Sequence, residues 1–125
     1  MGRNKKYDST KTLAAITDVF IQNGYNGTSL DDLVKATGLL RGSLYSQFGS
    51  KQGMFNAALA ESLRQQNDQL WGLLLVAMLE VTSKNKTAFD LVQKWYQHNH
   101  DGEIAEQIGL ALIKRSGIQG DENGK

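Results

Sequence analysis

The sequence contains no cysteine and no proline among its 125 residues. The absence of cysteine excludes a disulfide framework and any zinc site that depends on thiolate ligands. Long hydrophobic runs are also missing, because the longest one, residues 70–79, is about half of the roughly 20 residues that cross a bilayer. No charged start followed by an apolar core marks a secretory signal, so we expect a cytoplasmic protein that makes no use of a membrane.

Strand patterns are nearly absent as well. No run alternates apolar and polar residues with β-branched enrichment, whereas apolar residues recur at helical spacing along the chain. These patterns predict an all-α protein of about seven helices. No nucleophile, base and orienting acid stand out together, and no glycine loop suits a phosphate. We therefore expect no enzyme, no metal site and no cofactor.

The net charge is only +1, but the charges are unevenly distributed. Residues 1–55 carry seven basic and four acidic side chains, whereas the remainder carries seven basic and nine acidic ones. A positively charged first half and a negatively charged second half are consistent with a protein that binds a polyanion through its first half. We expect residues 1–6, MGRNKK, to form a basic arm ahead of the first helix.

The first half of the chain predicts short helices separated by turns. Ser29 and Asp32 have the spacing of a capping box at a helix start, and Gly38 supplies a tight turn before the next helix. Two short helices joined in this way make a helix-turn-helix, whose second member enters the major groove of DNA. We expect the three helices at about residues 10–23, 30–37 and 41–48, and a longer one that Ser50 caps.

The stretch GLLRGSLYSQFGSK, residues 38–51, supplies both faces of such a recognition helix. Leu44 and Phe48 are spaced i and i+4 and predict the buried face. Arg41 can bind guanine, Gln47 can read adenine, and Ser43 can contact either a base or a phosphate. Gly42 lets the backbone approach DNA, and the other polar groups suit phosphate oxygens. The residues that we expect to contact DNA are Thr28, Ser29, Arg41, Gly42, Ser43, Tyr45, Gln47 and Lys51.

Residues 12–59 resemble the DNA-binding domain of the TetR/AcrR family of bacterial transcriptional regulators. The resemblance rests on AA and F ahead of GY in the first helix, then TS, TG and GSLYSQFGSK at matching spacing. It implies a homodimer that places two helix-turn-helix units on a near-palindromic operator, and a helical body that a small-molecule effector can switch. Leu40 departs from the pattern, because the family usually has a small or polar residue there.

The resemblance divides the chain into an arm and DNA-binding head, residues 1–52, and a shortened helical dimerisation and regulatory body, residues 53–125. Residues 70–81 are apolar on all sides and predict a helix that is buried on more than one face. Thr87 is the expected N-cap of the next helix. The last helices resemble those that form the family's dimer interface. The residues expected there are Leu70, Leu74, Met78, Ile104, Ile108 and Leu112.

Two hypotheses remain open from the sequence. The first is a transcriptional repressor that binds double-stranded DNA as a homodimer and that a small ligand releases. The second is a truncated relative that acts as an interaction protein, pairing with another regulator without a ligand switch of its own. The mass of the protein in solution and its affinity for DNA distinguish them.

Overall fold

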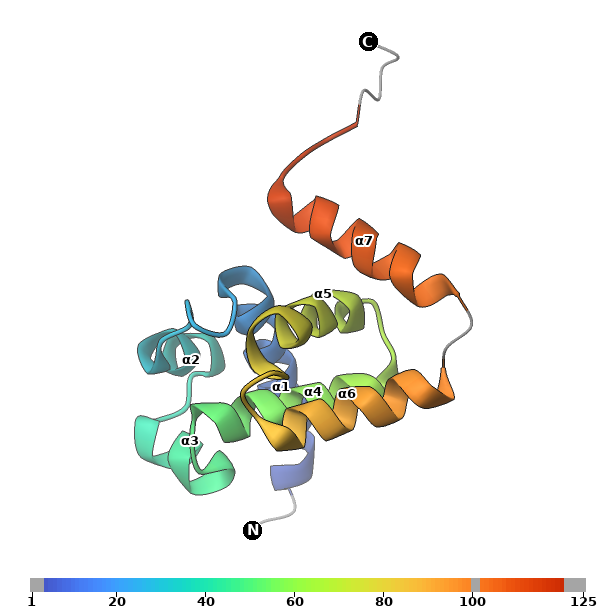
Figure 1. The fold of residues 1–125 in the computed structure, drawn as a ribbon. Helices are drawn as coiled ribbons and strands as arrows, with labels where there is room; N and C mark the ends of the chain where they lie inside the picture. The colour runs from blue at the N-terminus through green and yellow to red at the C-terminus, as the bar shows by residue number, and fades with distance from the viewer. Residues whose placement is uncertain (1–3, 100–101, 121–125) are drawn as a thin grey trace.

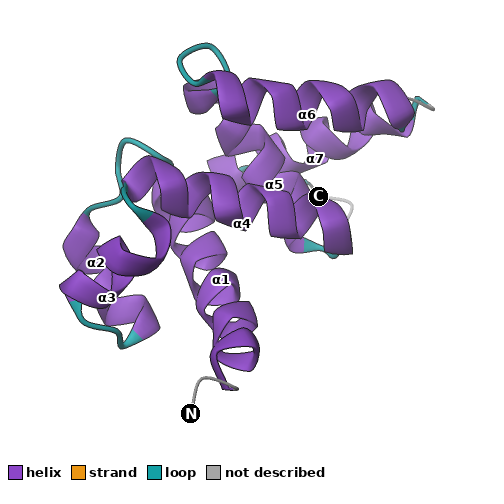
Figure 2. Cartoon of the chain, turned by 90° about the horizontal axis from the view of Figure 1, so that it is seen from below, coloured by secondary structure: helices purple, strands orange, loops and turns teal. Residues whose placement is uncertain are grey.

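The computed structural model describes residues 4–99 and 102–120, and these residues are helical apart from the connecting turns (Figure 2). The all-α prediction is therefore confirmed over the described part of the chain. In chain order the elements are α1 (Asn4–Asn23), α2 (Leu30–Thr37), α3 (Arg41–Phe48), α4 (Lys51–Gln65), α5 (Gln69–Val76), the π-helical segment η1 (Ala77–Val81), α6 (Lys86–His98) and α7 (Glu103–Ser116).

Helix α1 begins at Asn4, several residues before the predicted start near Thr10. The intervening residues contain neither glycine nor proline, so nothing in them stops a helix from extending toward the N-terminus. Part of the expected basic arm is thus the first turn of α1, and its first three residues lie outside the described part of the chain. The end of α1 is close to the prediction, because Gly24 follows it with a positive φ of 78°.

Helices α1 and α4 pack together and support the short helices α2 and α3, which lie at the left of the molecule in Figure 1. Phe20 of α1 and Phe55 of α4 meet edge to face with ring centroids 5.0 Å apart, and Tyr25 stacks on Phe20 at 5.7 Å. Aromatic pairs of this geometry stabilise a core beyond the area that they bury. The position of the two short helices therefore depends on this core.

Helix α5 lies between the pair α1 and α4 on one side and α7 on the other (Figure 1). Its Leu70 and Leu74 are fully buried within the protomer, and Ile104 of α7 is buried against the same core. The prediction that these three residues form a dimer interface is therefore wrong for this structure. An all-round apolar helix needs burial on several faces, and here the chain itself provides it. Ile108 also packs on this core, whereas Met78 and Leu112 remain exposed.

Asn85, rather than the predicted Thr87, caps α6. Its backbone is extended, and its Oδ1 atom accepts hydrogen bonds from the backbone N–H of Ala88 at 3.0 Å and from Asn56 of α4 at 3.1 Å. Two donors on one side-chain oxygen make Asn85 both the cap and a link to α4. Thr87 lies inside the first turn.

The predicted division between head and body falls in the first turn of α4. Phe55, just after this division, contacts Phe20 of α1, and one connected cluster of buried residues runs from α1 to α7. The two parts therefore share a hydrophobic core.

Leu40 stands at the N-cap position of α3, but its apolar side chain cannot make a capping hydrogen bond. Its φ and ψ of −71° and 151° are those of an ordinary N-cap. We therefore expect Leu40→Ser to raise the free energy of unfolding by about 1 kcal/mol, because serine can accept a hydrogen bond from a backbone N–H in the first turn. Urea unfolding of Leu40→Ser and Leu40→Ala, compared with the wild type, measures the effect. Equal stability of the serine and alanine variants would contradict it.

Candidate nucleic-acid interface

Helix α2 begins with a complete capping box, as its sequence predicts. The backbone N–H of Ser29 donates to Oδ2 of Asp32 at 2.9 Å, and the backbone N–H of Asp32 donates to Oγ of Ser29 at 3.0 Å. The bond from the backbone of Ser29 is the main reason that the pKa of Asp32 lies below its usual value. This arrangement fixes the start of the helix that precedes the recognition helix.

The turn between α2 and α3 depends on Gly38, whose φ of 75° is a left-handed conformation that other residues adopt only under strain. Its N–H donates to the carbonyl of Val34 at 2.9 Å and closes α2. The next N–H, that of Leu39, donates to Oγ1 of Thr37 at 3.1 Å, and the Leu39 side chain packs against the core. These contacts set the angle at which α3 leaves the turn.

Helix α3 has one buried face and one exposed face, as predicted. Leu44 is fully buried, and Phe48 is half-buried against the same core. No atom lies within 4 Å of the position that a Cβ of Gly42 would take, so the backbone is open to a ligand there. The exposed residues of this helix are Arg41, Gly42, Ser43, Tyr45, Ser46 and Gln47.

The polar side chains on this face are available for new hydrogen bonds. Within the described part of the chain, Ser43, Tyr45 and Gln47 have no side-chain hydrogen bond. A ligand can therefore pair with them without breaking a bond in the protein. Because successive residues of a helix are about 100° apart, these side chains are spread around the exposed surface of α3.

The guanidinium group of Arg41 forms an ion pair with the carboxylate of Asp31 on α2. Both side chains are exposed, so the pair contributes little to stability. It places the guanidinium group of Arg41 beside the first turn of α2, where Asp31 lies. The sequence alone did not identify this partner, because Asp31 lies ten residues earlier, across the turn between α2 and α3.

Two residues predicted to contact DNA are engaged inside the protein. Thr28 is only 3% exposed, and its hydroxyl donates to the carbonyl of Gly24 at 2.6 Å, so its assignment as an exposed phosphate ligand is wrong for this structure. The Nζ atom of Lys51 lies 4.4 Å from the centroid of the Tyr25 ring. Partial burial lowers the pKa of this ammonium group, although the charge of Glu80 opposes the shift. Ser29, by contrast, is exposed.

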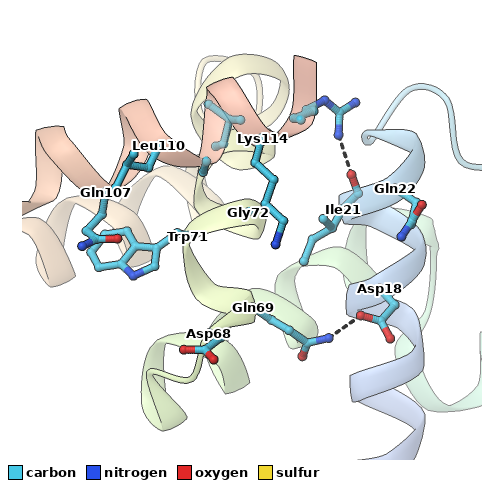
Figure 3. A pocket seen from close by; sticks show the side chains of 13 residues that line it. Asp18, Ile21, Gln22, Asp68, Gln69, Trp71, Gly72, Gln107, Leu110 and Lys114 are labelled. Carbon is cyan, nitrogen blue, oxygen red and sulfur yellow. Dashed lines mark hydrogen bonds between the residues drawn. The ribbon is translucent and has the colours of Figure 1, made fainter. Parts of the chain in front are cut away.

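A cavity of about 680 Å³ lies between α1, α5 and α7, on a different part of the molecule (Figure 3). The indole of Trp71 lines it from α5, and the side chain of Lys114 extends from α7 toward the space beside Ile21. Gln69 donates a hydrogen bond to Asp18 across its lower side in this view. The lining thus combines apolar side chains with about as many charged and amide ones, so it offers both apolar contacts and hydrogen-bonding groups.

Residues 4–99 and 102–120 contain no group of three side chains that could hold a metal ion. In the same ranges, no helix has both the length and the apolar character needed to cross a membrane.

Comparisons with known proteins concern the part of the chain that contains this interface. Residues 13–58, from α1 to the first half of α4, match the model of a family described as bacterial regulatory proteins, tetR family. The chain is 42% identical over 67 residues to YezE of Bacillus subtilis (strain 168), an uncharacterized HTH-type transcriptional regulator; the aligned part is 54% of this chain and 34% of that protein.

Two further relatives match the chain over similar lengths. The chain is 45% identical over 58 residues to the HTH-type transcriptional repressor ComR of Escherichia coli (strain K12), which is 46% of this chain and 28% of ComR. It is 37% identical over 60 residues to the HTH-type transcriptional regulator AcrR of Shigella flexneri, 45% of this chain and 28% of AcrR. The aligned part thus spans about a third or less of each relative's length.

The capping box makes the stability of α2 depend on pH. Because the pKa of Asp32 is lowered in the folded protein, its stabilising effect is fully present above the ordinary value of 3.8 and is lost as the pH falls through the lowered value. We expect Asp32→Asn to be less stable than the wild type near neutral pH, with a difference that shrinks in acid. Urea unfolding at a series of pH values measures this. Ser29→Ala keeps the backbone donor to Asp32 and removes only the hydroxyl, so the NMR-detected pKa of Asp32 should remain below its usual value in this variant; a pKa at the usual value would contradict the assigned main cause.

Proposed function

We propose that this chain, whose residues 13–58 match the model of the tetR family of bacterial regulatory proteins, is a member of that family and binds double-stranded DNA sequence-specifically as a homodimeric transcriptional repressor. The observation that carries the proposal is the exposed face of α3. It presents Ser43, Tyr45 and Gln47 without hydrogen-bond partners among the described residues, on a helix that the buried Leu44 anchors to the core. A helix of this kind follows the tight turn at Gly38, as a helix-turn-helix requires.

The chemistry of the face assigns roles to its residues. Arg41 can donate two hydrogen bonds to O6 and N7 of guanine after leaving Asp31, and Gln47 can pair with adenine. Ser43 and the hydroxyl of Tyr45 can donate to a base or a phosphate. Ser29 is exposed at the positive end of α2, where its hydroxyl can contact a phosphate.

A homodimer is part of the proposal because the basic charge of one protomer is modest. Two linked heads on a near-palindromic operator let weak contacts of each half-site combine. Exposed apolar side chains on α7 are the surface that we assign to the partner, since the residues of α5 are already buried. These side chains are Leu110, Leu112 and Ile113.

The cavity beside Trp71 supports the further proposal that a small ligand regulates DNA binding. Its walls come from α1, which belongs to the DNA-binding head, and from α5 and α7 of the body. A ligand that fits between them changes the packing of the body against the head, and such differential contacts are what couple two sites. The head then releases its operator when the ligand is bound.

The alternative is an interaction protein that pairs with a different regulator, without a ligand switch of its own. The exposed apolar residues of α7 favour it as much as they favour a homodimer. A stable monomer with no DNA affinity at low salt would support this alternative over the first proposal.

Arg41→Ala tests the reading of DNA sequence. Duplexes selected from a random pool by the wild-type protein define the operator. On this operator, we expect the variant to lose about 1–3 kcal/mol of discrimination at one base pair of each half-site, because a bidentate contact to guanine is removed. Fluorescence anisotropy titrations with single-base variants of the operator measure the loss. Lys35→Ala, which removes an exposed charge from α2, serves as the charge-matched control. Equal losses of Arg41→Ala on operator and random DNA would refute the reading role.

Leu112→Glu tests the dimer surface. Leu112 is 50% exposed on α7, so a charge there leaves the fold intact but prevents close apolar contact with a second copy. We expect the wild type to sediment as a dimer and the variant to sediment as a monomer at the same concentration. Ala60→Glu, at an exposed position of α4, introduces the same charge elsewhere and should leave the dimer unchanged. A dimer of undiminished stability in Leu112→Glu would remove α7 from the interface.

A further inference from the structure

Leu40 is an apolar residue in a position where the structure gives it nothing to pack against. It is 76% exposed, more than any other exposed large hydrophobic residue of the described chain. It also occupies the N-cap of α3 without capping it. Leucine is poorly suited to either role, since caps favour serine, threonine, aspartate or asparagine and water disfavours an apolar side chain. A contact outside the protomer accounts for a leucine at this position.

The local backbone directs Leu40 away from the core. Its extended φ and ψ place neighbouring side chains on opposite sides of the chain. Leu39 is the neighbour that packs against the core, and Leu40 is therefore the one that faces outward. It stands immediately before Arg41, at the N-terminal end of α3, and the N-terminal residues of a recognition helix are the ones that reach base edges in the major groove.

One apolar group is displayed on the base edges of the major groove, and it is the C5-methyl group of thymine. We propose that Leu40 is a specificity-determining residue whose side chain contacts the thymine C5-methyl group beside the base pair read by Arg41, an inference that rests on the proposed function of this interface. The contact removes both apolar groups from water and distinguishes thymine from cytosine, which lacks the methyl group.

The surroundings of Leu40 favour DNA over a second protein molecule. The next residues, Arg41, Gly42 and Ser43, are exposed and polar or lack a side chain, so Leu40 is not part of a continuous apolar patch. Stable protein interfaces need a sizeable buried centre, which a single leucine does not provide. The open space above Gly42 lets the backbone approach a base edge closely enough for Leu40 to reach a methyl group.

Replacement of thymine by deoxyuridine removes this methyl group and leaves every hydrogen-bonding group of the base unchanged. The experiment uses the full chain and the operator selected by the wild type, with each thymine replaced in turn by deoxyuridine. At one position in each half-site we expect the wild type to bind the deoxyuridine duplex about fourfold more weakly, as the loss of one buried methyl group predicts. Replacement in both half-sites should weaken binding by roughly fifteenfold, if the two half-sites contribute independently.

The Leu40 variants separate this role from a structural one. Leu40→Ala and Leu40→Ser should bind the thymine and deoxyuridine duplexes equally well at that position, while their discrimination at the base pair read by Arg41 persists. Leu40→Met, which keeps an apolar side chain of similar size, should retain the preference for thymine. Leu79→Ala removes a leucine that is 63% exposed in η1, far along the chain from α3, and should behave as the wild type.

The outcomes distinguish the inference from the proposed function. Wild-type protein that selects an operator yet tolerates deoxyuridine at every position would overturn the role of Leu40 and leave DNA binding intact. A penalty that persists unchanged in Leu40→Ala would do the same. A lowered mass in solution for Leu40→Ala, with no change in thymine preference, would assign Leu40 to a protein contact instead. Failure to select any duplex would overturn the proposed function and this inference with it.

Discussion

The packing of Phe55 against Phe20 and Tyr25 is the contact on which the rest of the structure depends. The ring of Phe55 presents its edge to both partners, with centroids 5.0 and 5.4 Å away. It joins α4 to the end of α1 and to the turn that follows α1. Because α3 packs on α4 and α2 packs on α1, the orientation of α3 depends on how these three rings hold α4 against α1. The placement of α2 and α3 therefore depends on aromatic residues outside these two helices.

Residues from the second half of the chain also contact the end of α1 and the turn that follows it. Oε1 of Glu80 in η1 accepts a hydrogen bond from the backbone N–H of Asn26 at 2.8 Å, and Arg115 of α7 donates to the carbonyl of Ile21. A Cβ at Gly24 would lie 2.7 Å from a carboxylate oxygen of Glu80, so this approach depends on glycine. Head and body thus meet through polar contacts as well as through the core, and neither has a boundary at which it could separate cleanly.

Local patterns predicted the helix-turn-helix well, because its determinants are close in sequence. The Ser29 and Asp32 capping box, the turn at Gly38 and the buried Leu44 all act within a few residues, and the structure bears them out. Predictions were wrong where the residue that buries or hydrogen-bonds a side chain could not be recognised from the sequence, and where two neighbouring residues could each cap a helix, as Asn85 and Thr87 could for α6. The apolar character of α5 predicted burial but could not show that α7 covers Leu70 and Leu74. The hydroxyl of Thr28 was assigned outward because its partner, the carbonyl of Gly24, is invisible in a pattern of side chains.

The ion pair between Asp31 and Arg41 changes how this arginine meets a polyanion. An isolated surface cation brings a cloud of mobile anions that it exchanges for phosphates, and the release of counterions from DNA makes affinity fall with salt. Arg41 instead carries a covalently tethered counterion on α2. In the proposed complex with DNA, transfer of Arg41 to a base edge would replace one fixed acceptor by another and leave Asp31 to be solvated by water. The free energy that Arg41 would contribute to DNA binding is therefore the difference between its contact with a base and its contact with Asp31. Such a difference favours a well-matched base over nonspecific attraction to phosphates.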